Sequence, residues 1–289
     1  MHVSVLEKEV LGFLKPVPGE IAVDATLGNG GHSRGILRGI GPAGFLVGID
    51  QDDEAILRAK QELRGFSNAA LINNNFRNID LILETLSIPA VDMVLFDLGV
   101  SREQLDSEGR GFSFRRDGPL DMRMDRQGEV SAADLVNTLS AGELGDILFR
   151  LGEERKARKI AARIVERRQR KPFETTEELA RTVGSCFPGW QRIHPATRTF
   201  QALRIAVNGE LDAFQEGLKK ALDRLKPAGR IVVLSYHSLE DRIAKQTFAS
   251  YSKEGKIDLL TKMICPTPEE IEKNPSARSA KLRAIQKKA

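Results

Sequence analysis

Four short apolar segments recur in the first hundred residues, and each is followed by polar or glycine-containing positions. They are rich in β-branched and other apolar side chains and occupy residues 21–23, 45–49, 69–72 and 93–96. Between them, residues 33–38 and 53–64 are typical of amphipathic helices. A fifth strand is expected at 230–235, after a helix over 211–225 that stops at a Pro-Ala-Gly sequence, 227–229. Strand–helix alternation of this kind predicts an α/β fold with a doubly wound parallel sheet.

The stretch from 106 to 208 has a different pattern. It shows no strand-like alternation, and it contains three sequences typical of helix N-termini, beginning at Ser131, Ser140 and Thr175. We therefore predict an all-helical domain at 106–208, inserted into a discontinuous α/β domain formed by 1–105 and 209–289.

A glycine-rich segment, Asp24-x-Thr26-x-Gly28-x-Gly30-Gly31-His32-Ser33, connects the first predicted strand to a helix. Glycines at such a turn let a ligand approach the backbone and the helix N-terminus closely. Asp50 ends the next predicted strand, where an acid can bind two ribose hydroxyls. This arrangement predicts a site for a nucleoside-containing cofactor.

Two cofactors compete for this site, a nicotinamide dinucleotide and S-adenosylmethionine. The dinucleotide motif G-x-G-x-x-G has Ser33 at its third glycine here, and Asp24 would repel a pyrophosphate. S-adenosylmethionine carries an ammonium and a sulfonium instead, and these are favoured by an acidic rim of Asp24, Asp50 and Asp97 at three strand ends. The sequence favours S-adenosylmethionine, with a nicotinamide-dependent oxidoreductase as the alternative.

Several of these residues also have an interpretation that involves no cofactor. Asp24 could cap the turn that follows it, His32 could be a satisfied polar residue at a helix start, and Phe76 could belong to the core rather than stack on adenine. Asp97 has the strongest functional case, because a carboxylate at the end of an apolar strand is costly without a partner.

The distribution of charge and the placement of cysteines and histidines indicate what the protein binds and where it is located. The net charge is only +4, but ten basic residues and three acids lie between 150 and 171, and the segment 276–289 holds five basic residues and no acid. These two basic segments suggest a polyanion partner. The two cysteines are far apart and the four histidines lack ligand spacing, so we expect no disulfide, no bound metal and a cytoplasmic location. No apolar run approaches the ~18 residues of a membrane span.

Seven longer motifs follow one another in order along nearly the whole chain. They occupy residues 2–10, 24–33, 97–106, 110–124, 201–211, 235–242 and 278–283. In these motifs the chain resembles the MraW family, the bacterial small-subunit ribosomal RNA (cytosine-N4) methyltransferases.

The resemblance implies a class I, Rossmann-like methyltransferase fold with an inserted helical substrate domain. It also implies methylation of one cytidine in the decoding region of 16S ribosomal RNA, within a small-subunit ribosomal particle. By position, the residues implied to bind S-adenosylmethionine are Gly30, Gly31, His32, Asp50, Phe76, Asp97 and Gln104. Gln104 is assigned by the resemblance alone. The sequence leaves the oligomeric state open, and a homodimer is one of the alternatives.

The exocyclic amine of cytosine is a poor nucleophile, so we expect a residue that orients it or accepts its proton. Asp97 is the first candidate and His237 the weaker second, since a histidine at a strand end can simply bond locally. Phe112, Phe114 and Tyr236 are candidates for stacking on the base. A DNA or protein methyltransferase, or a non-catalytic RNA-binding assembly factor, remains an alternative.

Overall fold

The computed structural model of the protein describes residues 4–289. The chain divides into two compact units, one made of residues up to Gly99 together with Leu211–Ala289, the other of Val100–Glu210. The boundaries predicted from the sequence lie at 105/106 and 208/209, whereas the units divide at 99/100 and 210/211. His2, in the first motif, lies outside the described residues.

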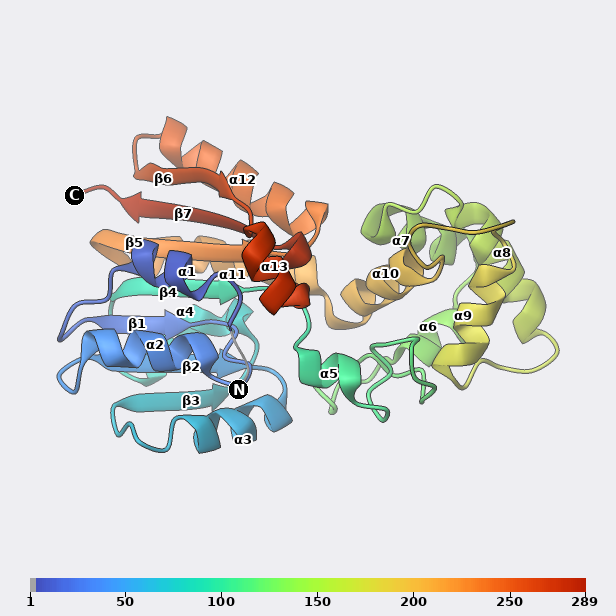
Figure 1. Cartoon of the computed structure of the whole chain (residues 1–289), viewed down its shortest axis with the longest axis horizontal. Helices are drawn as coiled ribbons and strands as arrows, with labels where there is room; N and C mark the ends of the chain where they lie inside the picture. The colour runs from blue at the N-terminus through green and yellow to red at the C-terminus, as the bar shows by residue number, and fades with distance from the viewer. Residues whose placement is uncertain (1–3) are drawn as a thin grey trace. The chain divides into compact units, whose positions relative to one another are not determined.

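The first unit is built on a seven-stranded sheet (Figure 1). In spatial order its strands are β3 (Ala69–Asn73), β2 (Phe45–Asp50), β1 (Ile21–Asp24), β4 (Val91–Asp97), β5 (Leu225–Ser235), β7 (Lys281–Lys287) and β6 (Ile257–Ile264). The first five strands run parallel, as the sequence predicts. β7 pairs antiparallel with both β5 and β6.

Helices cover both faces of this sheet. One face carries α1 (Glu7–Leu14), α2 (Gly31–Ile40) and α3 (Asp53–Glu62), and the other carries α4 (Ile79–Thr85), α11 (Glu210–Arg224) and α12 (Ser238–Lys253). Three short helices, η1 (Phe76–Asn78), α13 (Pro268–Lys273) and η2 (Pro275–Ser279), complete the unit.

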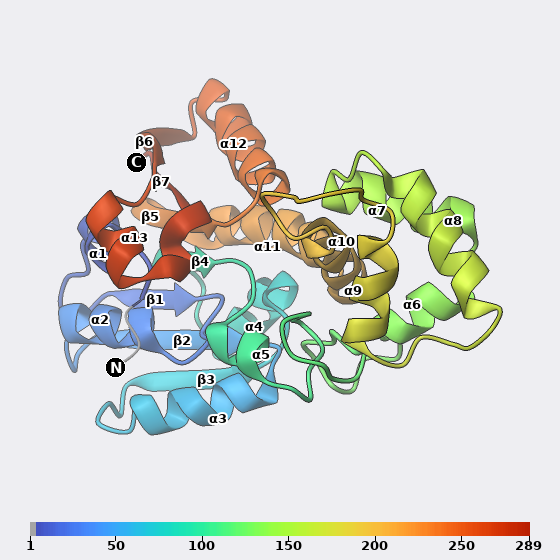
Figure 2. The same ribbon diagram turned by 45° about the vertical axis from the view of Figure 1, so that its right-hand side comes forward.

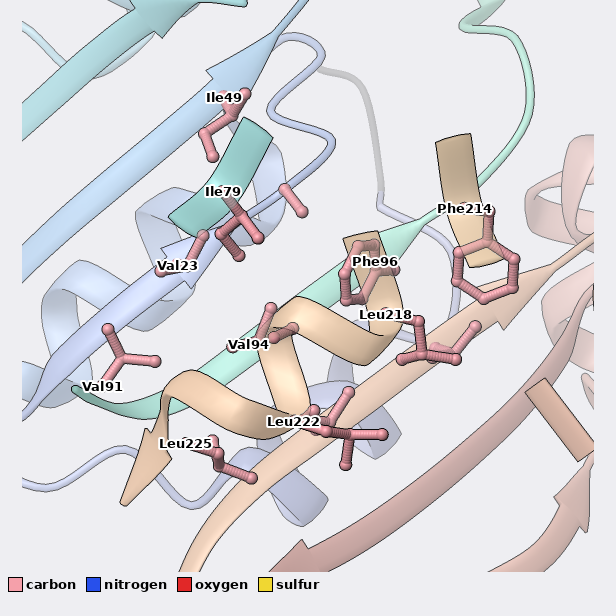
Figure 3. Packing of buried hydrophobic residues seen from close by; sticks show 14 of the residues in the cluster. Val23, Ile49, Ile79, Val91, Val94, Phe96, Phe214, Leu218, Leu222 and Leu225 are labelled. Atoms are coloured by element: carbon pink, nitrogen blue, oxygen red, sulfur yellow. The ribbon is translucent and has the colours of Figure 1, made fainter. Parts of the chain in front are cut away.

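The two faces are filled by alternate residues of the same strands. In β4, Met93 and Leu95 pack on the α1–α3 side, while Val94 and Phe96 pack on the α4–α11 side. Figure 3 shows Phe214 and Leu218 of α11 over Phe96 and Val94. A central strand buried on both faces needs a continuous apolar sequence, which explains why these strands could be identified without the structure.

Strand β7 lies where the sequence analysis expected a basic segment that contacts a polyanion. The basic segment 276–289 was expected to contact a polyanion, but most of it forms an inner strand of the sheet between β5 and β6. Leu282, Ala284 and Ile285 are buried, and the intervening Arg283 bonds Asp241 of α12 with an Nε–Oδ1 distance of 2.7 Å. Lys287 donates from Nζ to carbonyls at the end of α11, which is a favourable place for a cation. The charges of this segment are therefore largely used inside the fold.

The second unit is helical. It contains α5 (Arg102–Asp106), α6 (Ala132–Thr138), α7 (Ala141–Gly152), α8 (Ala157–Arg168), α9 (Thr176–Gly184) and α10 (Thr197–Asn208), and residues 100–210 form no strand longer than a single bridge. α7 packs against both α8 and α10 (Figure 2). Capping boxes start α6 at Ser131 and α7 at Ser140, as predicted; Thr175 caps α9 with its hydroxyl, but without the reciprocal bond.

Candidate active site

The candidate site lies at the carboxyl ends of the parallel strands of the first unit. β1 ends at Asp24, β2 at Asp50 and β4 at Asp97, and β5 leads into Tyr236. Because neighbouring parallel strands end at the same edge of a sheet, these residues meet there, which is where ligands bind in open α/β sheets.

The glycine-rich loop between β1 and α2 presents its backbone to this edge. Gly28 and Gly30 adopt the left-handed region, with φ of 51° and 81°, which side chains other than glycine adopt at a cost. A Cβ placed on Gly28 would meet only the Thr26 carbonyl, at 4.0 Å, so the space above this residue is open. The loop can therefore admit a ligand directly against its peptide groups.

Asp50 fastens this loop to the end of β2. Its Oδ2 accepts from the Gly28 amide at 2.8 Å, and its Oδ1 accepts from the Asp52 amide at 2.9 Å. Burial raises the pKa of Asp50 to about 6, although the two amides act in the opposite direction. Each carboxylate oxygen keeps a lone pair after these bonds, so Asp50 still has acceptors for two hydroxyl groups.

Asp24 has a different role from the open acidic rim predicted for it. The side chain is buried, its Oδ2 accepts from the Ser33 hydroxyl at 2.6 Å, and its Oδ1 accepts from the Thr26 amide at 3.2 Å. Burial raises the pKa of this carboxyl, against the bonds from Ser33 and Thr26. This geometry matches the alternative in which Asp24 caps its own turn.

Asp97 is the carboxylate around which the strand ends are organised. Its Oδ1 accepts from the Tyr236 hydroxyl at 2.7 Å, and its backbone amide donates to Thr26 Oγ1 at 2.6 Å. Burial and the negative charge of Asp97 raise the pKa of Tyr236 well above its ordinary value, so the phenol remains a donor. The half-buried Asp97 is thus held in place by residues from the loops after β1 and β5.

His32 stands on the other side of Asp97, at the start of α2. Its Nε2 lies 3.5 Å from Asp97 Oδ2, and neither ring nitrogen has a well-aligned hydrogen bond within the part of the chain that the structure describes. Burial lowers the pKa of His32, but the adjacent Asp97 carboxylate, together with the negative charge of Asp24, outweighs this effect and raises the pKa. A buried imidazole with an unused Nδ1 needs an additional partner.

Phe76 begins η1, directly after β3. Its ring packs edge-on against Phe96 with centroids 5.7 Å apart, and it closely approaches Gly217 of α11. The side chain is only partly buried, so the ring belongs to the edge of the core and keeps an accessible part. Both interpretations of Phe76, core residue and base-stacking platform, are compatible with this position.

Gln104 and His237 both serve as helix-capping residues. Gln104 lies in the helical unit, where its Oε1 accepts from the Ser101 amide at 2.9 Å and completes a capping box. His237 is the N-cap of α12; its Nδ1 accepts from the Glu240 amide at 3.4 Å, and its Nε2 lies 3.1 Å from Glu240 Oε1. For His237 this geometry favours the local alternative over a role as proton acceptor.

The three aromatic candidates for base stacking are placed very differently. Phe112 is buried in the core of the helical unit, and Phe114 is stacked on His194 at 4.4 Å between ring centroids. Tyr236 is held by its hydroxyl to Asp97. Phe112 is therefore the least accessible of the three rings to an incoming base.

Thr26 and the hydroxyl of Tyr236 are the parts of the site that sequence analysis did not assign. Thr26 was visible only as a member of the glycine-rich motif, and Tyr236 was considered as a stacking ring rather than a donor. A small hydroxyl residue two positions after a strand-end acid is the only signal that pointed to Thr26.

Among residues 4–289, no group of three His, Cys, Asp or Glu side chains is arranged to hold a metal ion. A helix that is both long and apolar enough to cross a membrane is likewise missing from this part of the chain.

Comparison with known proteins adds an independent line of evidence. A sequence model of the MraW methylase family matches residues 1–288. The Ribosomal RNA small subunit methyltransferase H of Syntrophotalea carbinolica is 49% identical over 306 residues, covering 99% of this chain and 98% of its own. The protein of the same name from Persephonella marina is 48% identical over 291 residues, covering 99% of both chains.

Solved structures also resemble this chain. The crystal structure of a candidate rRNA methylase from Clostridium thermocellum matches with a TM-score of 0.50 and 13% identity, covering 100% of this chain and 99% of that chain. At this level of identity the likeness concerns the fold alone. The α/β, Rossmann-like fold predicted from the sequence is confirmed.

Proposed function

Because the chain belongs to the MraW methylase family, we propose that it transfers a methyl group from S-adenosylmethionine to N4 of a cytidine in 16S ribosomal RNA. Relatives carrying the name Ribosomal RNA small subunit methyltransferase H supply the substrate class, and the family resemblance supplies N4 and the decoding region. The observation that carries the proposal is Asp97, held by Tyr236 and beside His32 at the sheet edge next to the glycine-rich loop.

The residues at this edge fit S-adenosylmethionine. The open backbone at Gly28 admits a ligand, Asp50 has free lone pairs for ribose hydroxyls, and the buried His32 has an unused Nδ1. The absence of a phosphate in S-adenosylmethionine also suits a loop that is bordered by carboxylates.

By this assignment seven residues would hold the cofactor. They are Gly30, Gly31 and His32 at the loop, Asp50 at the ribose, Phe76 at the adenine, and Asp97 and Gln104 toward the methionine end. When bound, the cofactor supplies an already activated methyl group, so the protein has mainly to align the two reactants.

Asp97 addresses the weak nucleophilicity of the cytosine amine. A carboxylate at the end of β4 accepts a hydrogen bond from N4–H, which fixes the amine and increases its electron density. Tyr236 occupies Oδ1, so Oδ2, on the His32 side, is the oxygen left for the amine and for the proton that leaves after transfer. Tyr236 and His32 act as positioning residues for Asp97, and His237 has no step in this mechanism.

We assign RNA binding to the helical unit. On α8 (Ala157–Arg168), Lys159 and Arg163 are four residues apart and exposed on one helix face, and the exposed Arg155 lies in the turn just before the helix. Phosphate contacts from such a face position an RNA without reading its sequence, and the target cytidine must be unstacked to react. The proposed substrate is therefore a small-subunit ribosomal particle in the cytoplasm, whose shape presents one cytidine.

The test is methyl transfer from labelled S-adenosylmethionine to small ribosomal subunits that lack this modification, followed by nucleoside analysis of the RNA. Wild-type protein is expected to give N4-methylcytidine, and Asp97→Asn to give almost none. Label in protein or DNA, or at another position of the RNA, would contradict the proposal. Binding of the particles without any transfer by wild type would identify an assembly factor instead.

A further inference from the structure

The connection between α9 and α10 carries an unusual surface. Residues 185–196 form the yellow-gold segment between these helices in Figures 1 and 2. Trp190, the only tryptophan in the chain, is 86% exposed, and Ile193 is 60% exposed. Trp190 makes no ring or cation–π contact with the residues that the structure describes. A tryptophan is seldom left this exposed unless it has a partner to bind.

Both ends of this connection are fastened to the helical unit. At the start, Lys156 of the α7–α8 turn places Nζ 4.2 Å from the centre of the Phe187 ring and 3.4 Å from the Cys186 carbonyl oxygen. At the end, the His194 ring stacks on Phe114 with centroids 4.4 Å apart. Trp190 therefore projects from the middle of a segment that is fixed on either side.

Cations surround this segment. Ser185 and Cys186, at its start, line an open hollow together with Lys159, Arg163 and Glu166 of α8. Arg163 pairs with Glu166 at 2.8 Å, so Lys159 is the cation of this hollow without an ion-pair partner among residues 4–289. Arg192, two residues after Trp190, is exposed and has no ion-pair partner among residues 4–289. An exposed aromatic ring beside several cations is the combination that binds single-stranded nucleic acid, because every base has a face to stack and every nucleotide a phosphate.

We propose that Trp190 stacks on an unpaired base of the ribosomal RNA outside the target cytidine, while Lys159 and Arg192 bind the adjoining phosphates. This inference rests on the proposed function and adds a second, separate RNA contact to it. An apolar protein surface fits this segment less well than RNA, because Lys159 and Arg192 would lose their hydration against it without gaining a partner.

The single tryptophan provides a direct measurement on the unmodified protein. Adding an unmethylated small-subunit rRNA transcript should quench Trp190 emission and lower its accessibility to acrylamide, since the ring becomes covered by a base. An RNA duplex of similar length offers phosphates but no unpaired base, so it should bind in a salt-dependent way with little change in emission. S-adenosylmethionine alone should leave the emission unchanged.

Variants then connect the contact to activity. Trp190→Ala should raise the KM for ribosomal particles by about 5- to 150-fold, the cost of one lost stacking contact, with kcat at saturation retained. Trp190→Phe keeps a ring and should lie close to wild type. Leu57→Ala removes another exposed large apolar side chain, from α3, and serves as the control with no expected effect.

The outcomes separate this inference from the proposed function. A wild type that methylates the particles, with unchanged Trp190 emission on RNA and a wild-type KM for Trp190→Ala, would overturn the stacking site alone. Quenching by the transcript without methyl transfer would overturn the proposed function alone. Quenching by intact particles but not by the protein-free transcript would assign the loop to a ribosomal protein and overturn the RNA contact.

Discussion

The α/β unit and helix α8 of the helical unit use charged side chains in opposite ways. In the α/β unit Arg283 bonds Asp241, with side chains only 13% and 14% exposed, and Asp97 is bonded to Tyr236. On and around α8, by contrast, Arg155, Lys159 and Arg170 are exposed and have no ion-pair partner within residues 4–289. Both regions are rich in charge, but the charges of β7 and of the strand ends are engaged inside the fold, whereas these cations of the α8 region are available to a ligand.

The comparison shows that the number of charged residues in a sequence segment does not indicate how many of them are free to bind a ligand. An internal charge is fixed by its partners, so its removal leaves the partner unpaired and costs stability or chemistry. An exposed, unpaired cation stabilises the fold very little, so its removal affects only what it binds. Each prediction below tests one side of this comparison.

The largest effect is expected at Asp97. Asp97→Asn removes the negative charge while keeping the side-chain size, so kcat should fall by about 10²- to 10⁴-fold because the amide oxygen can still accept a hydrogen bond but cannot take the proton of the amine. Particle affinity, measured by co-sedimentation, should remain near wild type.

Asp92→Asn provides the matched control for this variant. Asp92 lies in the same strand at the opposite end, where its Oδ2 accepts from Lys226 Nζ and the Ile21 amide at 2.8 Å. It should retain most of kcat. Comparable kcat values for the two variants would contradict the special role of the β4 carboxyl end.

Arg283→Ala tests the basic strand β7. Losing this guanidinium leaves Asp241 largely buried without its main partner, so the free energy of unfolding should fall by about 2–3 kcal/mol. Denaturant titration measures this change. Lys288→Ala, which removes the cation of a surface pair with Asp258, should cost under about 1 kcal/mol. Reduced RNA affinity of a stably folded Arg283→Ala protein would revive the interpretation of this segment as an RNA contact.

Replacing the unpaired cations on and around α8 tests whether exposed cations contribute to RNA binding rather than to stability. The combined variant Arg155→Ala, Lys159→Ala, Arg170→Ala should leave stability unchanged but weaken RNA binding roughly tenfold at moderate salt. The slope of log K against log salt should decrease by about 2 if each cation contacts one phosphate.

An equal change of net charge elsewhere controls for long-range electrostatics. Lys8, Lys60 and Arg64 are exposed cations of the α/β unit, and replacing all three with alanine should preserve the salt slope. The same reduction of slope in both triple variants would show that total charge, rather than the α8 face, determines RNA binding.

The sequence predicted most of the parallel sheet because its strands are buried on both faces and therefore continuously apolar, as in Val94-Leu95-Phe96. It missed β7 because Lys281, Arg283 and Lys287 interrupt the apolar pattern, and their partners come from distant helices. Partners of this kind follow only from the tertiary arrangement.

The candidate site likewise contains residues whose place was predictable from the sequence and contacts that were not. The strand-end positions of Asp50 and Asp97 were predictable, because a lone acid after an apolar run is visible in the sequence. The bond from Tyr236 to Asp97 was not, since the two residues are 139 positions apart. The local role of His237 was open to prediction, because a residue three positions before Glu240 at a helix start is well placed for capping.

The smallest expected effect concerns the pH dependence of cofactor binding through Asp50. Its pKa is raised to about 6, and the ionised form is the one with acceptors for both ribose hydroxyls. Affinity for S-adenosylmethionine should therefore be constant above pH 7, fall about twofold at pH 6, and fall roughly tenfold at pH 5 as the carboxyl is protonated.

Calorimetry of S-adenosylmethionine binding between pH 5 and 8 measures this dependence, and Asp50→Asn separates it from the titration of His32. The variant should bind more weakly at pH 8 and lose the decline near pH 6. Binding should also release protons near pH 6 in the wild type, since the ligand favours the ionised carboxylate. Proton uptake there, or an identical pH profile in Asp50→Asn, would exclude Asp50 from the ribose contact and leave it solely as the residue that holds Gly28 in place.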